Sequence, residues 1–507
     1  MIQKYPVGLQ DFGKIRTQNF VYVDKTEFVY QMADIGGYYF LSRPRRFGKS
    51  LFISTLECLF LAKKELFKGL YIEDKWNWEQ TYPIVRISFS NIGHKEKGLS
   101  RAIDDELNAI AKKYDIVLEE TIISGKFKEL IETLSKTRGK VVVLIDEYDK
   151  PIIDYLGDDT EKAIENRDIM KAFYSILKDA DPHLKLVFIT GVSKFSRVSI
   201  FSDLNNLQDI TTNKFFSGCC GITQDELEIY FERELQVSDK QRIKEWYNGY
   251  SWDVKTSVYN PFSLLNFFVQ GYEFKNFWFE SGTPTFLIKL AKQYHEYNFE
   301  DKETTLTHLS SYDLERLELI PLMFQTGYLT FKSYDEDSGV YTLKFPNKEV
   351  KKSYLEVLLD AVLEYPTKQG IVLVNEMRKA LLIGDIDKLE SILNTIFKSL
   401  PYELWQRENE HFYHAIIHLT FTLLGVYVQS EVQTSDGRMD ALIRLKDYVY
   451  CIEFKLDESA DMAIQQIKDK KYLQPFAHEG KKLIAIGVNF SKEKKKVEEL
   501  KWEEVLF

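Results

Sequence analysis

The sequence predicts an α/β protein of several domains, and three observations support that prediction. The chain has 507 residues, more than one hydrophobic core usually holds, so two to four domains are expected. Its first part alternates short apolar runs with helical segments, which is typical of parallel strands joined by crossover helices. Its last part, from Glu403 onward, again combines helices with strands.

Four short apolar runs in the first 210 residues are rich in Val, Ile and Phe, as the buried strands of a parallel sheet are. Helical segments separate these runs, so we expect a parallel sheet with helices on its faces. The strands are predicted at 38–42, 83–90, 140–149 and 184–192.

The rest of the chain follows other patterns. The region from about 220 to 310 is helical and aromatic, which is more typical of packing between helices than of stacking on nucleic-acid bases. The stretch 327–347 predicts two strands around an acidic turn, with helices on both sides, as in a small winged-helix-like module. The expected domains are a parallel-sheet domain at 1–215, a helical and winged-helix-like region at 216–400, and an α/β domain at 401–507.

Composition limits where this protein works and what it binds. The net charge is -10, so any contact with nucleic acid must come from a local basic patch. The four cysteines lack Cys-x-x-Cys spacing, which argues against a zinc knuckle or a disulfide framework. The N-terminus has no apolar signal core, and no run reaches the roughly 18 apolar residues of a membrane span. We therefore expect a cytoplasmic protein without membrane contact.

Residues 42–51, SRPRRFGKSL, end as a phosphate-binding loop does but do not begin as one. The usual loop has a glycine six residues before its lysine, and Arg43 stands at that position. The end of the loop has the required residues: Gly48 permits close backbone approach, Lys49 would reach the phosphates, and Ser50 could hold Mg²⁺. A predicted strand precedes the loop and a predicted helix follows it, which is the required setting.

The missing glycine leaves two interpretations of the loop open. Arg43, Arg45 and Arg46 could compensate with charge, since guanidinium groups pair well with phosphate. Alternatively, the loop binds a nucleotide and turns it over slowly.

Polar residues at the ends of two later strands fit the same site. Asp146 would hold the Mg²⁺ shell, and Glu147 would polarise the attacking water. Thr190 could sense the γ-phosphate, and Arg197, a few residues on, could contact phosphate. The alternative is a pair of strands that end in polar residues where they leave the core. Ligand sites of α/β proteins do form at the carboxyl ends of parallel strands, which favours the functional interpretation.

Several of these segments together resemble the bacterial AAA-ATPase-like family, in which RPRRFGKS is the ordinary form of the loop. In order along residues 4–270, they are FVYVDKTEFV, FLSRPRRFGKSL, VVVLIDEYDKPI, FITGVSKFS and EWYNGYSW with VYNPFSLLNF. The resemblance implies a P-loop ATPase domain that binds ATP with Mg²⁺, and places Asp24 and Lys25 near the nucleotide. The residues expected around ATP are Arg46, Phe47, Gly48, Lys49, Ser50, Leu51, Asp146 and Thr190, with Glu147 as the catalytic residue and Ser50 and Asp146 on the metal.

A second candidate site lies in SDGRMDALIRLKDYVYCIEFKLDE, which predicts a hairpin with 446–447 as a two-residue turn. In that register Asp440 lies opposite Glu453 on one face of the sheet, and Lys455 shares that face. Paired carboxylates are unfavourable without a cation, and Mg²⁺ prefers oxygen ligands. Such a metal could activate water for phosphodiester hydrolysis, and Gln466 on the next helix could reach the site.

The hairpin interpretation has its own alternatives. Lys-Asp is not a favoured hairpin turn, so a longer loop would shift the register. A polar sheet face with a salt-bridged lysine would also give this pattern.

The surrounding segments resemble the PD-(D/E)XK nuclease superfamily domain over about residues 403–500. They are ENEHFYHAIIHLTF, SEVQTSDGRMDALI, CIEFKL, AIQQIKDKKY and KLIAIGVNFS. The resemblance implies a restriction-endonuclease-like α/β fold with Asp440, Glu453, Lys455 and Gln466 as the catalytic set, and with Asp440 and Glu453 on Mg²⁺. Glu410 and Glu431 are further candidates.

Three functions stay open at this point. The first is an ATP-controlled, Mg²⁺-dependent nuclease that acts on nucleic acid, DNA in the first place, with defence against foreign DNA as one role. The second is an NTP-dependent switch whose C-terminal domain binds nucleic acid or a protein partner without cleaving it. The third is a scaffold in which both sites are vestigial, which the intact site residues argue against. An oligomer is compatible with each.

Overall fold

The computed structural model describes the chain in two compact units, Met1–Phe286 with Glu300–Glu349, and Leu287–Phe299 with Val350–Phe507. Some short segments lie outside the described residues: 1–3, 194–199, 202–203, 281–284, 311–316, 364–369, 399–409, 428–431, 436–438, 492 and 495. Side chains are also not described at 280, 410–415, 426–427, 432–435 and 439–440.

The first unit is built on a parallel sheet with the strand order β2-β3-β4-β1-β5. Its strands are β1 (Gly37–Ser42), β2 (Ile84–Ser88), β3 (Val141–Asp146), β4 (Leu184–Gly191) and β5 (Leu207–Asp209). The four strands predicted from apolar runs are confirmed. The strand β5 was missed, because three residues of the sequence Leu-Gln-Asp carry no apolar pattern. Since all strands run the same way, the ends of β1, β3 and β4 meet at one edge of the sheet.

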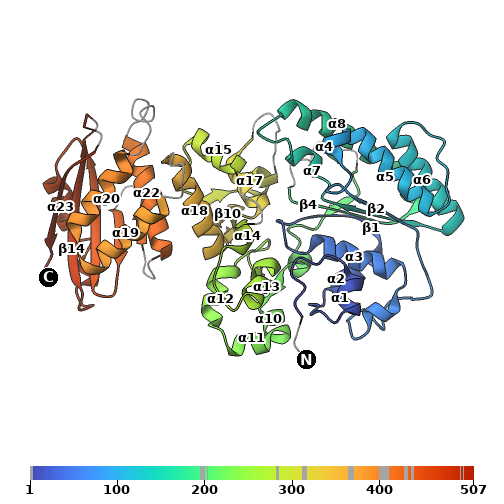
Figure 1. Ribbon diagram of the computed structural model, residues 1–507, viewed down its shortest axis with the longest axis horizontal. Coiled ribbons are helices and arrows are strands. Elements are labelled where there is room, and N and C mark those ends of the chain that lie inside the picture. Colours follow the sequence, from blue (N-terminus) through green and yellow to red (C-terminus); the bar gives the residue numbers. More distant parts are fainter. Residues whose placement is uncertain are drawn as a thin grey trace. The chain divides into compact units, whose positions relative to one another are not determined.

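Helices cover both faces of this sheet (Figure 1). On one face lie α1 (Phe12–Thr17), α2 (Thr26–Ile35) and α3 (Lys49–Phe60). On the other lie α4 (His94–Lys97), α5 (Leu99–Lys113), α6 (Ile123–Arg138), α7 (Lys150–Ile153) and α8 (Thr160–Asp179). The expected crossover arrangement of an α/β domain is therefore present.

A helical region with an aromatic core continues the first unit. Its elements are β6 (Ile222–Thr223), α10 (Gln224–Tyr230), α11 (Glu232–Gln236), α12 (Lys240–Tyr247), β7 (Val258–Tyr259), α13 (Pro261–Val269) and α14 (Phe277–Glu280). Tyr247, Tyr259 and Phe267 belong to one buried cluster. These aromatic residues pack between helices, as the sequence indicates, and are not available for stacking on bases.

The predicted two-stranded segment at 327–347 is also present. Its strands β9 (Thr330–Asp335) and β10 (Val340–Lys344) are antiparallel, and β8 (Lys302–Thr304) pairs with β10 as a third strand. In the sequence, α16 (Leu306–Ser310) and α17 (Leu319–Thr326) precede the hairpin within the first unit, and α15 (Thr285–Tyr294) and α18 (Lys348–Val362) belong mostly to the second unit. None of the described helices has the length and apolar character needed to cross a bilayer.

The second unit has a mixed sheet with the order β11-β12-β13-β14-β15, in which only the β13–β14 pair is parallel. Its elements are α19 (Gly370–Ile383), α20 (Ile386–Lys398), α22 (Glu410–Tyr427), β11 (Val432–Ser435), β12 (Met439–Arg444), β13 (Tyr448–Leu456), α23 (Ala460–Asp469), β14 (Lys482–Ser491) and β15 (Lys496–Glu504). The helix α23 joins the parallel pair and packs on both of its strands.

The hairpin register in this sheet is the predicted one. Ala441 pairs with Ile452 and Arg444 with Val449. The backbone N–H of Leu445 donates to the carbonyl oxygen of Tyr448 at 2.7 Å, which leaves 446–447 as the two-residue turn. The unfavoured Lys-Asp turn is therefore accepted, because the strands' alternation fixes which face is buried.

Candidate active sites

The loop between β1 and α3 has the backbone of an anion-binding loop. Gly48 precedes α3 with φ +95°, a conformation that favours glycine, and the helix begins at Lys49. Arg46 also has a positive φ of +67°. A helix N-terminus has backbone N–H groups without intrahelical partners and a partial positive charge, so phosphate is stabilised there.

Lys49 holds this loop together in the structure. Its side chain is buried, and its ammonium donates to the carbonyl oxygens of Arg43 and Pro44 at 2.9 Å each. Burial lowers the pKa of Lys49, and the charges of Asp146 and Glu147 oppose that shift. The Lys49 ammonium is thus hydrogen-bonded within the loop. An incoming phosphate would compete with the two carbonyl oxygens for it.

Arg43, at the position of the missing glycine, has a structural role. Its guanidinium is fully buried and donates to the carbonyl oxygens of Thr211 at 2.8 Å and Phe216 at 3.2 Å. It also lies 4.0 Å from the centroid of the Trp252 ring. The prediction that Arg43 supplies charge to a phosphate is therefore wrong, because the side chain braces the loop from behind.

The acidic end of β3 faces this loop. Asp146 is buried, and its Oδ1 has no hydrogen-bond partner among the described residues. Burial raises the pKa of Asp146, while a hydrogen bond with Ser50 and the charge of Lys49 lower it. Glu147 follows with φ +51°, in the left-handed region that non-glycine residues rarely adopt.

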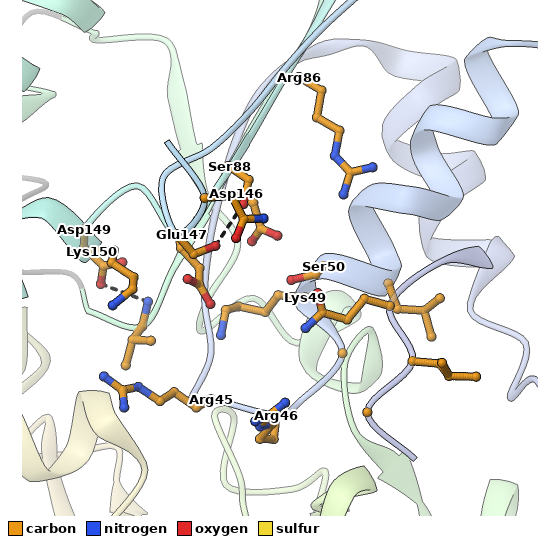
Figure 2. A pocket seen from close by; sticks show the side chains of 18 of the residues that line it. Arg45, Arg46, Lys49, Ser50, Arg86, Ser88, Asp146, Glu147, Asp149 and Lys150 are labelled. Carbon is orange, nitrogen blue, oxygen red and sulfur yellow. Dashed lines mark hydrogen bonds between the residues drawn. The ribbon is translucent and has the colours of Figure 1, made fainter. Parts of the chain in front are cut away.

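One cavity of about 760 Å³ brings these groups together. Figure 2 shows Lys49 and Ser50 at the start of α3 and Asp146 and Glu147 at the end of β3 around it. The remaining predicted residues on its wall are Arg45, Arg46, Gly48 and Leu51. Its volume is in the range of small-molecule sites. The guanidinium of Arg46 also lies 5.0 Å from the Phe262 ring centroid.

A small apolar slot of about 90 Å³ adjoins this cavity and shares Gly48 and Leu51 with it. Phe47 lines the slot and packs edge-on against Tyr250, with 4.7 Å between the ring centroids. Other wall residues include Val21, Val23, Lys25, Cys219, Cys220 and Ile222.

Thr190, which was expected at the nucleotide, is not on the cavity wall. Thr190, at the end of β4, is fully buried and pairs in the sheet with Leu41. It is not among the residues that line the cavity, whereas Val192 is. Arg197 lies outside the described residues.

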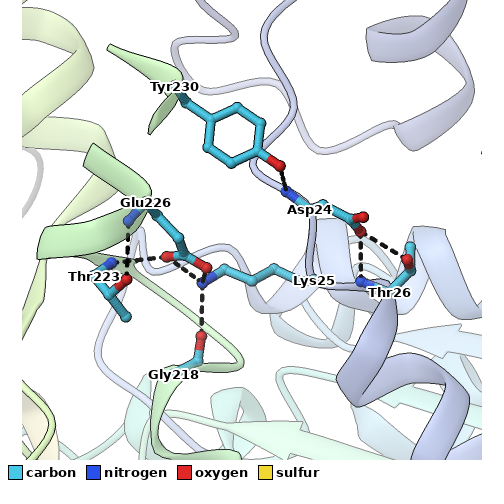
Figure 3. A network of polar contacts seen from close by, with 7 residues as sticks. All are labelled: Asp24, Lys25, Thr26, Gly218, Thr223, Glu226 and Tyr230. Atoms are coloured by element: carbon cyan, nitrogen blue, oxygen red, sulfur yellow. Dashed lines mark hydrogen bonds and ion pairs between the residues drawn. The ribbon is translucent and has the colours of Figure 1, made fainter. Parts of the chain in front are cut away.

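The Asp24-Lys25 pair, expected near the nucleotide, belongs to a polar network (Figure 3), and Lys25 also lines the slot. The ammonium of Lys25 donates to both carboxylate oxygens of Glu226, at 2.6 and 2.7 Å, and to the carbonyl of Gly218 at 2.7 Å. Asp24 accepts from the backbone N–H groups of Thr26 and Tyr71. Lys25 therefore contributes to the slot wall, and Asp24 fixes the backbone next to it.

In the second unit, the structure brings Glu453, Lys455 and Gln466 together. Glu453 and Lys455 share one face of β13, and Gln466 approaches from α23. The Gln466 amide Nε2 donates to Glu453 Oε1, and Lys455 Nζ donates to Gln466 Oε1 at 2.7 Å. Lys455 Nζ is 3.9 Å from Glu453 Oε1. The buried Glu453 carboxylate is thus held by an amide and an ammonium.

The other predicted members of this set are only partly described. Asp440 precedes Ala441 in β12, so the register continues to Glu453 at the opposite backbone position, but its side chain lies outside the described residues. The same holds for the side chain of Glu410, at the start of α22, and for all of Glu431. Where side chains are described, no three His, Cys, Asp or Glu residues gather as metal ligands.

A glycine lets α23 approach this site closely. Gly487 on β14 pairs with Glu453, and a Cβ built on it would lie 2.1 Å from the carbonyl oxygen of Ala460. Only a residue without a side chain fits there, and the close approach brings Gln466 within reach of Glu453.

Comparison with known proteins decides the family. A model of the predicted AAA-ATPase family matches residues 6–201, and a model of the PD-(D/E)XK nuclease superfamily matches residues 408–500. An Azotobacter chroococcum mcd 1 protein, "Uncharacterized protein in vnfD 5'region", is 39% identical over 511 residues, which span 98% of both chains. The chain belongs to this AAA-ATPase-like family with a C-terminal PD-(D/E)XK nuclease domain.

A solved structure, the Aeropyrum pernix ORC1 protein in complex with DNA, matches with a TM-score of 0.29 and 11% identity. The match covers 66% of this chain and 93% of that one.

The structure of this AAA-ATPase-like protein also shows site residues that sequence reasoning missed. Arg86 lines the cavity from β2 and forms an ion pair with Glu57 of α3 at 2.5 Å. An arginine inside the otherwise apolar run PIVRISFS was the available signal. Asp149, the next acid after Glu147 in DEYD, is buried at the same cavity and was also overlooked.

Proposed function

We propose that this AAA-ATPase-like protein binds and hydrolyses ATP at the cavity beside Lys49, and that its nuclease-superfamily domain is a Mg²⁺-dependent phosphodiesterase acting on nucleic acid, DNA in the first place. The observation that supports the first half most strongly is the single cavity lined by Lys49, Ser50, Asp146 and Glu147. These residues come from two elements distant in sequence, and each has a defined task in phosphoryl transfer.

ATP binding follows from the loop. The phosphates accept hydrogen bonds from the backbone N–H groups at the start of α3, and the Lys49 ammonium exchanges its carbonyl partners for phosphate oxygens. The apolar slot next to Gly48 takes the base, because an aromatic ring gains free energy by leaving water.

The residues around Ser50 fit a Mg²⁺ ion. The buried Oδ1 of Asp146 lacks a partner among the described residues, and the hydroxyl of Ser50 interacts with this carboxyl group. Ser50 and Asp146 would hold the ion, which supplies charge neutralisation of the phosphate oxygens. Glu147 then orients and polarises the attacking water, and Arg45 and Arg46 add positive charge at the cavity wall.

In the nuclease-superfamily domain, Glu453 would hold the metal together with Asp440, which the strand register assigns to the opposite position. Bound Mg²⁺ would supply an activated water and neutralise phosphate charge. The Lys455 ammonium, held toward Glu453 by Gln466, can stabilise the charge that develops on the phosphodiester. A role in defence stays a prediction.

A second candidate function is an ATP-dependent switch whose C-terminal domain binds nucleic acid or a protein without cleaving it. One observation favours it: the carboxylate of Glu453 is already engaged by Gln466 and Lys455. A metal that binds Glu453 would compete with these partners for Oε1.

The deciding experiment incubates the full chain with Mg²⁺, ATP, and single-stranded DNA, double-stranded DNA or RNA. We expect ATP turnover that Lys49→Ala abolishes, and cleavage that Asp440→Ala abolishes while ATP turnover continues. Lys162→Ala, which removes a surface ion pair with Glu165, is the matched control. Turnover without cleavage of any nucleic acid supports the switch instead, and the absence of ATP binding and turnover refutes both.

A further inference from the structure

The segment after Glu147 is hydrogen-bonded to the residues at which the chain leaves β4. These residues, Gly191–Ser193, are called the β4 exit. Asp149 is buried, and its Oδ2 accepts hydrogen bonds from the backbone N–H groups of Val192 at 2.9 Å and Ser193 at 2.7 Å, and from the Ser193 hydroxyl at 2.6 Å. One carboxylate oxygen therefore orders two successive backbone N–H groups and a side chain. Charge-assisted hydrogen bonds of this kind are stronger than neutral ones.

Tyr148 makes the same connection by other atoms. Its backbone N–H donates to the carbonyl of Thr190 at 3.1 Å, and its hydroxyl donates to the carbonyl of Ser193 at 2.9 Å. Between these contacts lies Gly191, where a Cβ would come within 2.6 Å of Asp149 Oδ1 and of the Tyr148 ring. The two segments are thus packed as closely as a glycine allows.

These contacts flank a strained residue. Glu147 has φ +51°, and its carbonyl oxygen accepts from the N–H of Lys150 at 3.0 Å in the turn that leads into α7. A left-handed conformation of a non-glycine residue persists when the surrounding structure over-determines it. Here the residues immediately after Glu147 are fixed to β4 by both backbone and side-chain hydrogen bonds.

We propose that Tyr148 and Asp149 form a clamp on the exit of β4 that holds Glu147 in its hydrolytic position, so that Asp149 is a positioning residue for ATP hydrolysis. This inference rests on the proposed ATPase function and assigns a role to a residue outside the phosphate loop and the acidic pair. Asp149 acts through Glu147 and does not touch the substrate.

A direct role for Asp149 on phosphate or metal fits the contacts less well. Although Asp149 lines the cavity, its Oδ2 is occupied by three donors, and its Oδ1 lies against Gly191. Both oxygens therefore face the β4 exit. Burial raises the pKa of Asp149, and the hydrogen bonds from Ser193 oppose that shift in favour of the carboxylate.

The test compares Asp149→Asn with the wild-type full chain in ATP binding and steady-state hydrolysis. The amide keeps the shape and one acceptor oxygen but loses the negative charge that strengthens the three hydrogen bonds at Oδ2. We expect kcat to fall by about 10- to 100-fold, the effect of a misplacement near 1 Å, with the Kd for ATP changed by less than about twofold. Asp159→Asn, which keeps an N-cap on α8 away from the cavity, is the matched control and should change neither quantity.

A double variant separates positioning from a merely structural effect. If Asp149 acts through Glu147, Glu147→Gln with Asp149→Asn hydrolyses ATP as fast as Glu147→Gln alone, within about twofold. A further loss of about tenfold or more in the double variant would overturn the proposal. So would an unchanged kcat in Asp149→Asn.

A readout without turnover keeps this test independent of the proposed function. In Asp149→Asn, hydrogen exchange should accelerate in peptides that cover both the 147–150 turn and the 191–193 exit, and Asp159→Asn should leave both unchanged. If the wild type binds ATP without hydrolysing it, the ATPase proposal fails while exchange still tests the clamp. Unchanged exchange at the turn refutes the clamp in either case.

Discussion

The two candidate sites of this protein differ in the partners that surround their buried carboxylates. In the first unit, the buried Asp146 has an oxygen without a hydrogen-bond partner among the described residues, beside a cavity of about 760 Å³. In the second unit, the buried Glu453 accepts from Gln466 and lies 3.9 Å from the Lys455 ammonium. Asp146 is therefore buried with a hydrogen bond to Ser50 and the charge of Lys49, whereas an amide and an ammonium lie at Oε1 of Glu453.

This difference follows from the physics of burial. A buried carboxylate without partners is unfavourable, because it has lost water and gained nothing in return. Proteins keep such groups where binding or catalysis uses them. A buried carboxylate that has an amide and an ammonium within reach recovers part of its desolvation cost, and removing one of these partners is destabilising. Substitutions of the two carboxylates should therefore change the free energy of unfolding in opposite directions.

The largest expected effects are on activity, and each variant should lower one of the two activities only. Glu147→Gln removes the base at the ATP site and should lower hydrolysis by about 100- to 10,000-fold. Glu453→Gln should lower DNA cleavage by a similar factor while ATP turnover changes by less than about twofold. Parallel assays of phosphate release and DNA cleavage on each variant measure both effects.

The controls for this pair are exposed glutamates of the same units, Glu165→Gln and Glu458→Gln, which should change neither assay. If Glu453→Gln slowed ATP hydrolysis by about tenfold or more, the two sites would act as one catalytic unit. The two sites would then not be independent of each other.

A large effect on stability is expected for the ion pair between Lys25, which lines the apolar slot, and Glu226. Lys25 contacts Glu226 and the Gly218 carbonyl, whereas Glu226 also accepts from the backbone N–H of Thr223 at 2.8 Å (Figure 3). Breaking a buried ion pair typically costs about 3–5 kcal/mol. Each charge keeps one backbone partner when the other is removed, but the Lys25 side chain is the more buried, with 10% exposed against 18% for Glu226. Glu226→Met, which leaves Lys25 alone, should therefore approach about 3 kcal/mol, and Lys25→Met should cost less.

Chemical denaturation of the single variants and of Lys25→Met with Glu226→Met measures this asymmetry. The double variant should recover most of the lost stability, since no charge is then left buried alone. Equal losses in the two single variants would show that the difference in burial between Lys25 and Glu226 has no effect on stability. Additive losses in the double variant would show that the ion pair does not couple them.

The sequence predicts the local and periodic features of these sites well. The apolar runs of β1 to β4 and the alternation around 446–447 fix strands, register and faces, because each depends on neighbouring residues. Lys49, Ser50, Asp146 and Glu147 could be proposed together because the ends of parallel strands meet at one edge of a sheet.

Features that depend on distant segments could not be predicted in this way. Arg43 was interpreted as a phosphate ligand, but its partners Thr211, Phe216 and Trp252 follow more than 160 residues later. The burial of Asp149 depends on the β4 exit in the same way. The strand β5 is set by pairing with β1 rather than by its own residues. The domain boundaries at 215 and 400 stay a prediction.

A medium effect is expected where α23 approaches the second site. In Gly487→Ala the new Cβ would lie 2.1 Å from the Ala460 carbonyl oxygen and 3.1 Å from the Ala463 Cβ, so the helix must move. Overpacking of this kind typically costs about 1–3 kcal/mol. The shift also takes Gln466 away from Glu453, so cleavage should fall with stability while ATP hydrolysis stays unchanged.

Calorimetry and the two activity assays test Gly487→Ala. Gly13→Ala is the control, because Gly13 lies in α1 without a positive φ, and its Cβ would come no closer than 3.3 Å to any neighbour. An unchanged melting temperature of Gly487→Ala would show that α23 can move away from β14 without loss of stability. The close approach would then not be what positions Gln466.

The smallest expected effect has opposite signs at the two sites. Burial raises the pKa of Asp146 above its ordinary value near 3.8, so the folded state holds that proton more tightly than the unfolded state does. The stability from the protonated form is complete below the unfolded pKa and is lost as the pH rises through the folded pKa. At neutral pH, Asp146→Asn should therefore stabilise its unit by about 1 kcal/mol, and this gain should shrink as the pH falls toward 4.

Glu453→Gln should instead destabilise its unit by about 1 kcal/mol, because it removes the charge that pairs with Lys455. Hydrogen exchange of β3 and β13 peptides, measured between pH 5 and 8 and corrected for the intrinsic exchange rate, reports each unit separately. A loss of stability in Asp146→Asn would mean that this carboxylate already has a favourable partner, and the contrast between the two sites would then be one of geometry alone.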